Sequence, residues 1–401
     1  MEDVVKRQIN DQGVVIATPY LWRKPLHQKE ILSIGLVKPP VYYKGNVLIP
    51  SNYGTNQNII KRLTLTDTET GKTIWSWDDQ FDSKTDNIYI FFYHQHNNLL
   101  TFQWGSRSYC INMDTGKSQW RIRRDRSFDP RIDSWEQYYF TYATIINSDG
   151  HNEQIAFRGD IHTGEIAEYL TANFTYDHPD CVRAVCNVVK VPNQENLLLV
   201  YYAENLPDWI TQSYYGLYDI ELKEWIWDKM EVAPPKRENG LYHPLQIYND
   251  KIYAEICNNI VCHDLATGKL LWRREFNYDF MCSGFIIEDG RLFANNEEGF
   301  ACCLDTETGN LLWKVNTAGT GSRLSYLNGV VYFVGGSVRR LFAIDAKSGK
   351  IVWKIDPGLF GEGDKAGFRT NAVYVLPAKD GKPAKVIALS NLYAYCFEAY
   401  R

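Results

Sequence analysis

The residues of this sequence that are best suited to chemistry are two histidines separated by one position. His94 and His96 would lie on the same side of an extended segment, because successive side chains alternate between the two faces of a sheet. Two imidazoles so placed could ligate a metal ion, but a metal site needs further ligands and none lies nearby in the sequence. We therefore interpret the pair as a chance spacing among the 8 histidines of the chain and expect no metal site.

Signatures of other catalytic classes are missing from the sequence. It contains no glycine-rich phosphate-binding loop, no Gly-x-Ser-x-Gly elbow and no Cys-His signature. Its most regular carboxylates are aspartates that recur along the whole chain. A residue that every repeat needs cannot mark one active site, so we expect no catalytic residue.

The recurring unit is exemplified by residues 305–313, which read Asp-Thr-Glu-Thr-Gly-Asn-Leu-Leu-Trp. An apolar run precedes the Asp, and the Trp follows the Gly by four positions. An Asp that bonds its own backbone and a Gly with positive φ are typical of hairpin turns, so each unit predicts a β-hairpin whose second strand carries a Trp. Copies of the unit occupy residues 67–75, 112–120, 160–168, 219–227, 264–272, 305–313 and 345–353.

The spacing of these units predicts the fold class. The turn glycines, or Lys223 in the fourth copy, recur every 40 to 59 residues, which is typical of propeller blades. Residues 392–398 match the third strand of a blade, and residues 20–24 match an isolated fourth strand. We therefore predict an all-β, eight-bladed β-propeller of four-stranded blades over residues 19–401, whose ring is closed by an N-terminal strand that joins the C-terminal blade. Residues 1–18 are expected to form a lead-in, either a short helix or irregular.

The pattern of strand, Asp, Thr-Gly-Lys and Trp resembles the repeat of the quinoprotein alcohol dehydrogenase-like propellers, which are also called pyrroloquinoline quinone-like repeats. The resemblance covers nearly the whole chain, from Pro19 to Arg401. It implies that the repeated tryptophans pack between adjacent blades. These predicted structural tryptophans are Trp22, Trp75, Trp120, Trp227, Trp272, Trp313 and Trp353. The family includes quinone-dependent dehydrogenases, an outer-membrane assembly lipoprotein, sensor domains and propellers that bind only other proteins, so the resemblance implies a fold and not one function.

The quinone enzymes of that family carry a calcium site, a catalytic Asp and a disulfide between adjacent cysteines beside the quinone. This chain has an adjacent pair, Cys302 and Cys303, but the pair falls inside a predicted strand, where neighbouring side chains point to opposite faces. Two packed thiols are the favoured interpretation. No position matches the calcium ligands of the family, and we expect no cofactor.

Composition and termini suggest a compartment. The segment that begins at Met1 has no apolar stretch of signal-peptide length, no apolar run of membrane-spanning length occurs, and the 9 cysteines show no disulfide framework. These features favour a cytoplasmic protein without membrane insertion. The formal net charge of −5 gives no attraction to nucleic acid. We expect a monomeric propeller whose partners are proteins.

Insertions point to a binding face. Extra residues occur in four connections between blades (121–134, 171–179, 231–241 and 356–369) and between the second and third strands of the fourth blade (205–211). Both kinds of connection emerge on the same face of a propeller, and long loops on a rigid scaffold often carry binding sites. Seven residues of these connections are the predicted partner-binding residues: Arg123, Arg124, Arg126, Trp209, Ile210, Leu359 and Phe360.

Each group has an alternative interpretation. The apolar residues could fold back over the blades as small cores, and the arginines could belong to a solvated strand end that Asp125, Asp129 and Asp133 partly neutralise. We predict a non-catalytic protein-binding propeller, acting as a scaffold or as an inhibitor of the immunity type through the face with the long loops. The alternative is a quinone-dependent dehydrogenase, or another enzyme, that uses the central channel.

Overall fold

The computed structural model of the chain describes residues 5–26, 41–55, 58–79, 81, 93–104, 106–124, 134–146, 152–170, 182–194, 196–206, 210–237, 245–278, 280, 284–318, 321–361, 367–390 and 392–401. These residues belong to two compact units, one formed by residues 1–89 with 280–401 and the other by residues 90–279. None of the described helical segments is long and apolar enough to cross a membrane.

The first unit contains four sheets, each built on four blade strands that run in chain order except where β3 completes the last blade. Their strands are β4 (Tyr42–Tyr43), β5 (Asn46–Thr55), β6 (Asn58–Thr66) and β7 (Thr73–Trp77); β24 (Ile286–Glu288), β25 (Arg291–Asn295), β26 (Phe300–Asp305) and β27 (Leu311–Asn316); β28 (Ser325–Leu327), β29 (Val330–Gly335), β30 (Arg340–Asp345) and β31 (Ile351–Ile355); and β32 (Phe368–Leu376), β33 (Lys385–Ser390), β34 (Tyr393–Glu398) and β3 (Tyr20–Pro25).

The second unit contains the other four sheets, again with four strands each in chain order. Their strands are β8 (Tyr93–His96), β9 (Leu99–Trp104), β10 (Arg107–Asn112) and β11 (Lys117–Arg123); β12 (Ser134–Trp135), β13 (Tyr138–Ile146), β14 (Asn152–Asp160) and β15 (Ile166–Leu170); β16 (Val182–Lys190), β17 (Leu197–Leu206), β18 (Ile210–Asp219) and β19 (Glu224–Arg237); and β20 (Gln246–Tyr248), β21 (Lys251–Ile256), β22 (Asn259–Asp264) and β23 (Leu270–Glu275).

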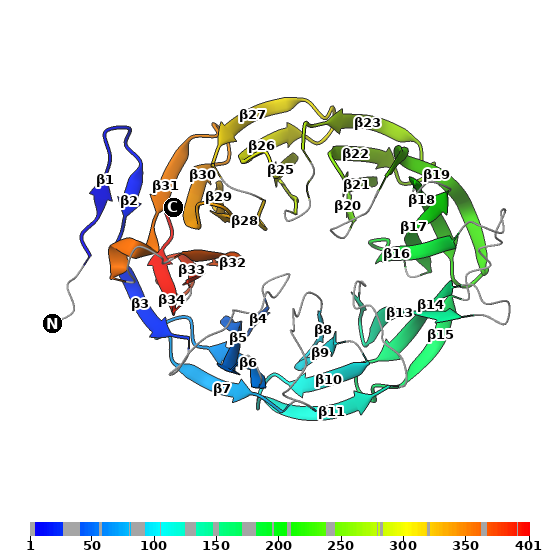
Figure 1. Ribbon diagram of the computed structural model, residues 1–401, viewed down its shortest axis with the longest axis horizontal. Helices are drawn as coiled ribbons and strands as arrows, with labels where there is room; N and C mark the ends of the chain where they lie inside the picture. The colour runs from blue at the N-terminus through cyan, green and yellow to red at the C-terminus, as the bar shows by residue number, and fades with distance from the viewer. Residues whose placement is uncertain are drawn as a thin grey trace. The chain divides into compact units, whose positions relative to one another are not determined.

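Eight sheets, each built on four antiparallel blade strands, make this fold an all-β, eight-bladed β-propeller, as the repeats predicted. Strand β3 completes the last blade by pairing with β34, with Trp22 opposite Cys396 and Lys24 opposite Ala394 (Figure 1). The predicted closure of the C-terminal blade by an N-terminal strand is therefore confirmed. Closure of this kind gives the edge of β34 a partner that it would otherwise lack.

The N-terminal lead-in is a β-hairpin, which corrects the expectation of a helix or an irregular segment. Strands β1 (Gln8–Ile9) and β2 (Val15–Ala17) pair antiparallel with each other. Strand β2 also lies parallel to β31 through the pair Val15 and Trp353, so the sheet of β28 to β31 has six strands. Val15 is buried by this contact. The sequence pattern contains no repeat here, because the hairpin adds to a finished blade.

The turns between the third and fourth strands follow the predicted chemistry. Asp67 Oδ1 accepts a hydrogen bond from the Thr70 N–H at 2.7 Å, and Asp305 Oδ1 accepts one from the Thr308 N–H at 2.8 Å. Burial would raise the pKa of Asp67, but the hydrogen bonds from Thr70 outweigh it and the pKa is lowered. Lys223 takes the place of the turn glycine with a φ of 57°, a left-handed conformation that costs a non-glycine residue some strain.

The repeated tryptophans join each blade to the next turn. Trp313 donates its indole N–H to the Ala346 carbonyl at 2.9 Å, and its ring lies so close to Gly349 that a Cβ there would sit 2.8 Å from ring atoms. Gly349 is therefore required both by its φ of 71° and by the tryptophan. Trp22, Trp120 and Trp227 make the same bond, to the carbonyls of Thr68, Ile161 and Leu265 at 3.0, 2.7 and 3.2 Å. For these four residues the packing that the resemblance implied is confirmed.

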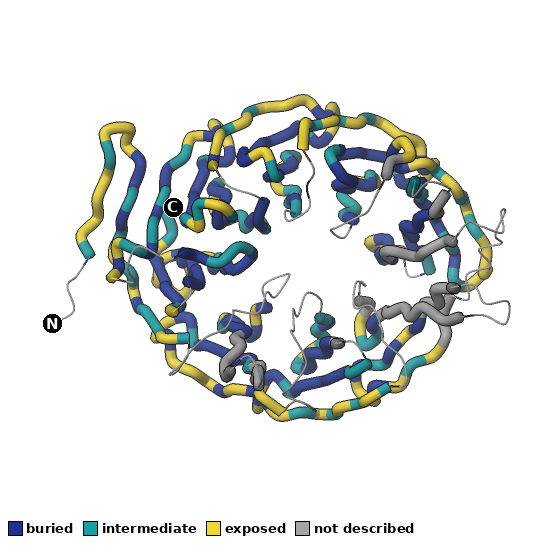
Figure 2. Tube along the Cα trace, viewed as in Figure 1, coloured by how far each residue is buried: buried dark blue, intermediate teal, exposed yellow. Residues whose placement is uncertain are grey.

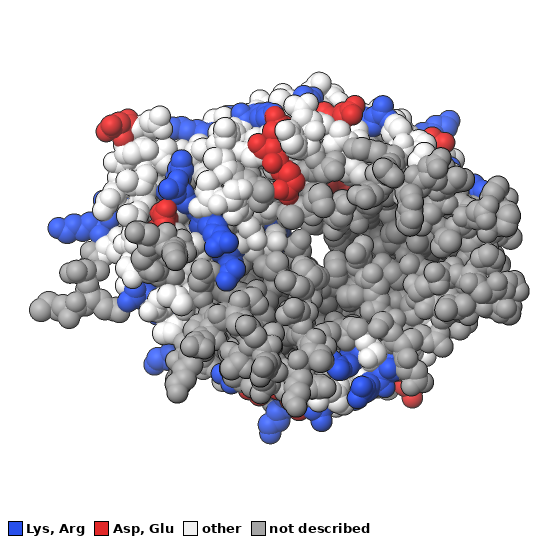
Figure 3. Space-filling view, viewed as in Figure 1, with Lys and Arg blue, Asp and Glu red and all other residues white. Residues whose placement is uncertain are grey.

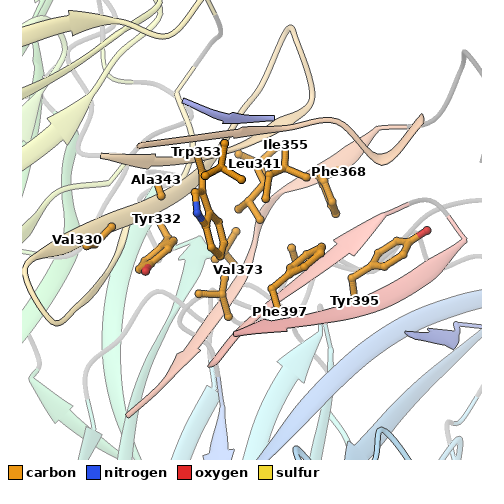
Figure 4. Packing of buried hydrophobic residues seen from close by; sticks show 14 of the residues in the cluster. Val330, Tyr332, Leu341, Ala343, Trp353, Ile355, Phe368, Val373, Tyr395 and Phe397 are labelled. Carbon is orange, nitrogen blue, oxygen red and sulfur yellow. The ribbon is translucent and has the colours of Figure 1, made fainter. Parts of the chain in front are cut away.

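Burial follows strand position within each sheet. Every residue of β29 is buried, whereas exposed and half-buried residues alternate along most of β27 (Figure 2). Between the sheets that contain β31 and β34, large rings interdigitate: Trp353, Phe397, Tyr395 and Phe368 belong to one buried cluster (Figure 4). The same cluster contains Phe360, one of the predicted partner-binding residues.

Candidate partner-binding site

The turn between the second and third strands of a sheet shares one edge with the connections that lead to neighbouring sheets. This follows from the antiparallel order, because the chain enters the first strand and leaves the fourth at the edge where the second strand ends. We call this edge of each sheet its connection edge. In the regular sheet of β20 to β23 the turn at the connection edge consists of Cys257 and Asn258.

The sheet of β16 to β19 extends well beyond this regular length. Strands β17 and β18 pair from Leu197 and Asp219 to Leu206 and Ile210, whereas β21 and β22 pair only from Lys251 and Asp264 to Ile256 and Asn259. Because the turn aspartates, Asp219 and Asp264, are equivalent, the added residues all lie at the connection edge. Strand β19 continues along this extension as far as Arg237.

These pairings correct two predicted loops. Most of residues 205–211, and the part of 231–241 up to Arg237, are paired strand. All four strands of the sheet lengthen together, because β16 also pairs with β17 as far as Val182 and Asn205, so the added backbone groups between neighbouring strands find partners. Gln212 is buried in the extension and its side-chain amide donates to the Ala233 carbonyl at 3.1 Å. Pro234 and Pro235 follow on β19, the outermost strand of the sheet. Because proline has no N–H, these residues discourage another strand from pairing with the outer edge of β19.

Similar extensions occur in two other sheets, and the sequence analysis did not identify them. Strands β5 and β6 pair from Val47 and Thr66 to Thr55 and Asn58. Strands β13 and β14 pair from Tyr138 and Asp160 to Ile146 and Asn152. The signal that could have found them is the number of residues between the first turn of each repeat and its turn aspartate, which is larger here than in the regular copies.

The connection edge of the last two blades brings two arginines together. The turn after β29 ends at Arg339, which has a φ of 51° and is exposed. The Arg339 carbonyl accepts a hydrogen bond from the Phe368 N–H at 2.8 Å. The Arg339 stem lies over Gly367, where an added Cβ would be 2.5 Å from Arg339 Cδ. The start of β32 is thereby held against the Arg339 turn.

A bulge at the start of β32 displays the second arginine. Phe368 lies opposite Ser390 and Val373 opposite Ala388, so residues 369–372 face a single residue of β33. Asn371 sits in this bulge with a φ of 59°; its Oδ1 accepts from the Arg323 N–H at 2.6 Å and its own N–H donates to Ser322 Oγ at 3.0 Å. Bulges of this kind often redirect side chains at functional sites. Here the bulge carries Arg369.

The electrostatics of Arg369 are unusual for a side chain at the surface. Burial, followed by the positive charge of Arg339, lowers the pKa of Arg369. Its Nε atom is buried and has no hydrogen-bond partner. By contrast, Arg340, which follows Arg339 in the chain, forms a salt bridge with Asp356 at 3.0 Å. Figure 3 shows lysine and arginine side chains gathered over the region of β28 to β32.

Leu359 and Phe360, both predicted to bind a partner, have different environments. They belong to a 3-10 helix, η2 (Pro357–Phe360), that Asp356 caps by accepting from the Gly358 N–H at 3.0 Å. Leu359 is 46% exposed, but Phe360 is only 5% exposed and its ring lies 5.1 Å from that of Tyr395. Phe360 is therefore a core residue, which corrects its assignment as an exposed anchor. Its ring packs against the aromatic rings of the last blade and not toward solvent.

The predicted residues of the second unit are only partly described. Arg123 is exposed at the end of β11 and remains a predicted binding residue. Arg124 donates to the Gly164 carbonyl at 2.6 Å and to Ser108 Oγ at 3.2 Å, so its guanidinium links two blades. Ile210 is half-buried at the end of β18. Arg126 and Trp209 lie outside the described residues.

The histidine and cysteine pairs take part in packing. His94 is 4% exposed, and its ring stacks on that of His96 at 6.4 Å. The turn after β14 brings His162 within 6.3 Å of His96, a contact between ring centroids that the sequence did not indicate. Among the described residues no group of three or more potential ligands could hold a metal ion. Cys302 and Cys303 are buried thiols, and burial raises the pKa of Cys303 to about 12.

The free energy of unfolding is expected to fall between about pH 6.5 and about pH 4 because of His94. Burial lowers the pKa of His94 from 6.5 to about 4. Between these values the unfolded chain binds a proton that the folded chain excludes, and the loss approaches about 3 kcal/mol at the acid end. It is absent above the unfolded pKa and stops growing below the folded pKa. Urea unfolding measured across this pH range by circular dichroism tests the prediction.

The matched variants for this test are His94→Leu and His162→Gln. The His94→Leu protein should lose much of the pH dependence, whereas His162→Gln should keep it because His162 is exposed. Equal pH dependence in the wild type and in His94→Leu would contradict the prediction.

Comparison with known proteins gives partial matches in sequence. A family model described as outer membrane protein assembly factor BamB matches residues 257–376. The dehydrogenase subunits of alcohol dehydrogenase (quinone) from Gluconacetobacter polyoxogenes and Gluconobacter oxydans (strain 621H) are 29% identical over 122 residues and 32% identical over 121 residues. Each alignment covers 27% of this chain and only 16% of the relative's own length.

Solved structures match over most of the chain. The computationally designed Ika8 protein superposes with a TM-score of 0.59 at 11% identity, covering 92% of this chain and 98% of that one. Sqt1 from Saccharomyces cerevisiae superposes with a TM-score of 0.62 at 10% identity, covering 94% of this chain and 98% of that one. At these identities the likeness concerns the fold alone.

Proposed function

Since the chain belongs to the propellers built from pyrroloquinoline quinone-like repeats, we propose that it is a non-catalytic protein-binding module that uses the connection edges of its blades. The matching family model describes an assembly factor, which supports a role in holding other proteins. In this proposal the chain acts in the cytoplasm as a monomeric scaffold, or as an inhibitor of the immunity type that covers a partner's working surface.

The observation that carries the proposal is the extension of the sheet of β16, β17, β18 and β19 beyond the regular blade. Folding alone does not require it, because the regular blade with β21 and β22 closes with two residues at the same position. The extension is stiff, since its strands are paired and Gln212 fastens β18 to β19. A preorganised surface loses little conformational entropy on binding, which favours affinity.

The exposed Leu359 adds a second contact of the type found at interfaces. It is presented by a capped turn whose neighbour, Phe360, is anchored in the core. Arg23 also donates to the Phe360 carbonyl at 3.1 Å and steadies the turn. An apolar side chain held in place in this way can enter a pocket of a partner without first being ordered.

The main alternative is a quinone-dependent dehydrogenase, the activity named for the partial sequence relatives. The described residues do not fit the calcium and quinone centre of such enzymes. Cys302 and Cys303 are successive residues of β26, paired with Ala294 and Phe293, and their side chains point to opposite faces of the sheet. No described group of acidic or histidine residues is arranged to hold a metal ion. We therefore derive no step of catalysis.

The proposal predicts loss of a partner when the extension is shortened. In the test variant, residues 205–211 are replaced by an Asn-Gly turn, which suits a two-residue hairpin. The tagged wild type and variant are incubated with lysate of the source cells, and bound proteins are identified by mass spectrometry. We expect a stoichiometric partner on the wild type that the shortened protein does not retain.

The matched control is Leu222→Ser, which changes a 67% exposed residue at the opposite edge of the same sheet. It should retain the partner, and both variants should melt like the wild type. Retention by the shortened protein, or loss with Leu222→Ser, would contradict the use of the connection edge. In parallel, the wild type is mixed with excess pyrroloquinoline quinone and calcium, and absorbance and dye reduction are followed; turnover would favour the enzyme instead.

A further inference from the structure

Arg339 and Arg369 are held together by the backbone around them. The hydrogen bond between Phe368 N–H and the Arg339 carbonyl is 2.8 Å long, and the absence of a side chain at Gly367 lets the Arg339 stem lie against the backbone just before β32. The bulge of residues 369–372 then places Arg369 at the same point of the connection edge. These contacts hold the backbone and the stem of Arg339 against the start of the strand that carries Arg369.

Among the described residues, no acidic side chain compensates the two positive charges. Arg340 has Asp356 as its ion-pair partner, but within the described ranges Arg339 and Arg369 form no salt bridge, and Arg369 Nε lacks an acceptor. An arginine does not become neutral in this situation, because its guanidinium holds its proton at any physiological pH. Arg369 is half-buried beside the positive charge of the exposed Arg339, and this arrangement is unfavourable unless an anion joins the two charges.

We propose that Arg339 and Arg369 form a binding site for one oxyanion, a carboxylate or a phosphate group, whose oxygens bridge the two guanidiniums. A planar guanidinium offers parallel N–H donors that match the spacing of such oxygens, which a lysine cannot reproduce. The stem of Arg339 lies flat on Gly367, so its charged end is directed by packing and loses little freedom when the anion binds. The site shares no residue with the extended sheet of β16 to β19 on which the proposed function rests.

Two sources could supply this chemistry: a free oxyanion in solution, or an acidic side chain of a protein partner. Both are tested on the purified full chain, so the result does not depend on finding a natural partner. One arm titrates inorganic phosphate and the other a hexaglutamate peptide, each against sodium chloride of equal ionic strength to remove general screening. Binding is measured by isothermal titration calorimetry and by the shift of the melting temperature.

We expect saturable binding of at least one probe to the wild type. Arg339→Gln and Arg369→Gln should each weaken it by about tenfold or more, as the loss of a charge-assisted hydrogen bond implies. Arg273→Gln, which removes an exposed cation from β23, should bind like the wild type. Without any probe, Arg369→Gln should melt no lower than the wild type, because it removes a half-buried charge that forms no salt bridge with a described residue.

The outcomes separate the two sources and the proposal itself. Tighter binding of hexaglutamate than of phosphate identifies an acidic partner segment, and the reverse identifies a free oxyanion. Equal affinity in the wild type and both arginine variants, or no saturable binding of either probe, would overturn the site. If Arg369→Gln does not fold, the exposed Arg339→Gln still decides the question.

Discussion

Replacing Phe360 with alanine is expected to lower the free energy of unfolding by about 3–5 kcal/mol, the cost of deleting a buried aromatic ring. The ring is 5% exposed, and it lies 5.1 Å from Tyr395, 5.7 Å from Phe397 and 6.0 Å from Tyr20. These partners come from β34 and β3, so the cavity would open in the blade that the two ends of the chain build together. Urea unfolding followed by circular dichroism measures the loss.

The neighbouring residue provides the control. Leu359→Ala changes a side chain that is 46% exposed, and its effect on stability should stay within about 0.5 kcal/mol. If Leu359 contacts a partner, this variant should weaken binding at unchanged stability. A Phe360→Ala protein that is as stable as the wild type but has lost its partner would restore Phe360 as a binding residue and refute its place in the core.

Replacing Trp313 with alanine is expected to cost about 3 kcal/mol, near the lower end for aromatic residues because the ring is half-buried. The substitution removes the bond to the Ala346 carbonyl and the face that covers Gly349. It also uncovers Phe293, whose ring lies 6.0 Å away. The measurement is the melting curve together with urea unfolding.

Two further variants separate the contributions to this loss of stability. Trp313→Phe keeps an aromatic ring but loses the indole N–H, so the part due to the lost hydrogen bond should be about 1 kcal/mol. Leu312→Ala, one residue earlier on the same strand, removes a side chain that is 48% exposed and should leave the melting curve nearly unchanged. An unchanged curve for Trp313→Ala would show that the repeated tryptophans do not hold the blades together.

The two residues of η2 show where sequence reasoning about the site reached its limit. Leu359 and Phe360 are adjacent and apolar, and a turn of four residues is too short for periodicity to indicate which side faces inward. The difference arises from the ring cluster of Tyr20, Tyr395 and Phe397, whose members come from both ends of the chain. The extended strands were mistaken for loops for a related reason, because continued pairing depends on neighbours that are distant in sequence.

What the sequence by itself determined is the blade and its count. The turn aspartates, the left-handed turn residues and the tryptophans act within or next to one hairpin, so their spacing is visible along the chain. The strand at residues 20–24 and the strand at residues 392–398 complement each other, and this predicted the completed last blade. These features either depend on residues that are close in the sequence or follow the same local pattern as the other blades.

Only the tertiary structure decided where the N-terminal hairpin docks, which apolar loop residues are exposed, and that Arg339 meets Arg369. Hydrogen bonding in a turn is settled by neighbouring residues, whereas burial and charge pairing depend on which surfaces the fold brings into contact. Gly367 illustrates the difference. Along the chain it is one glycine among 28, whereas in the folded structure its lack of a side chain makes room for the stem of Arg339.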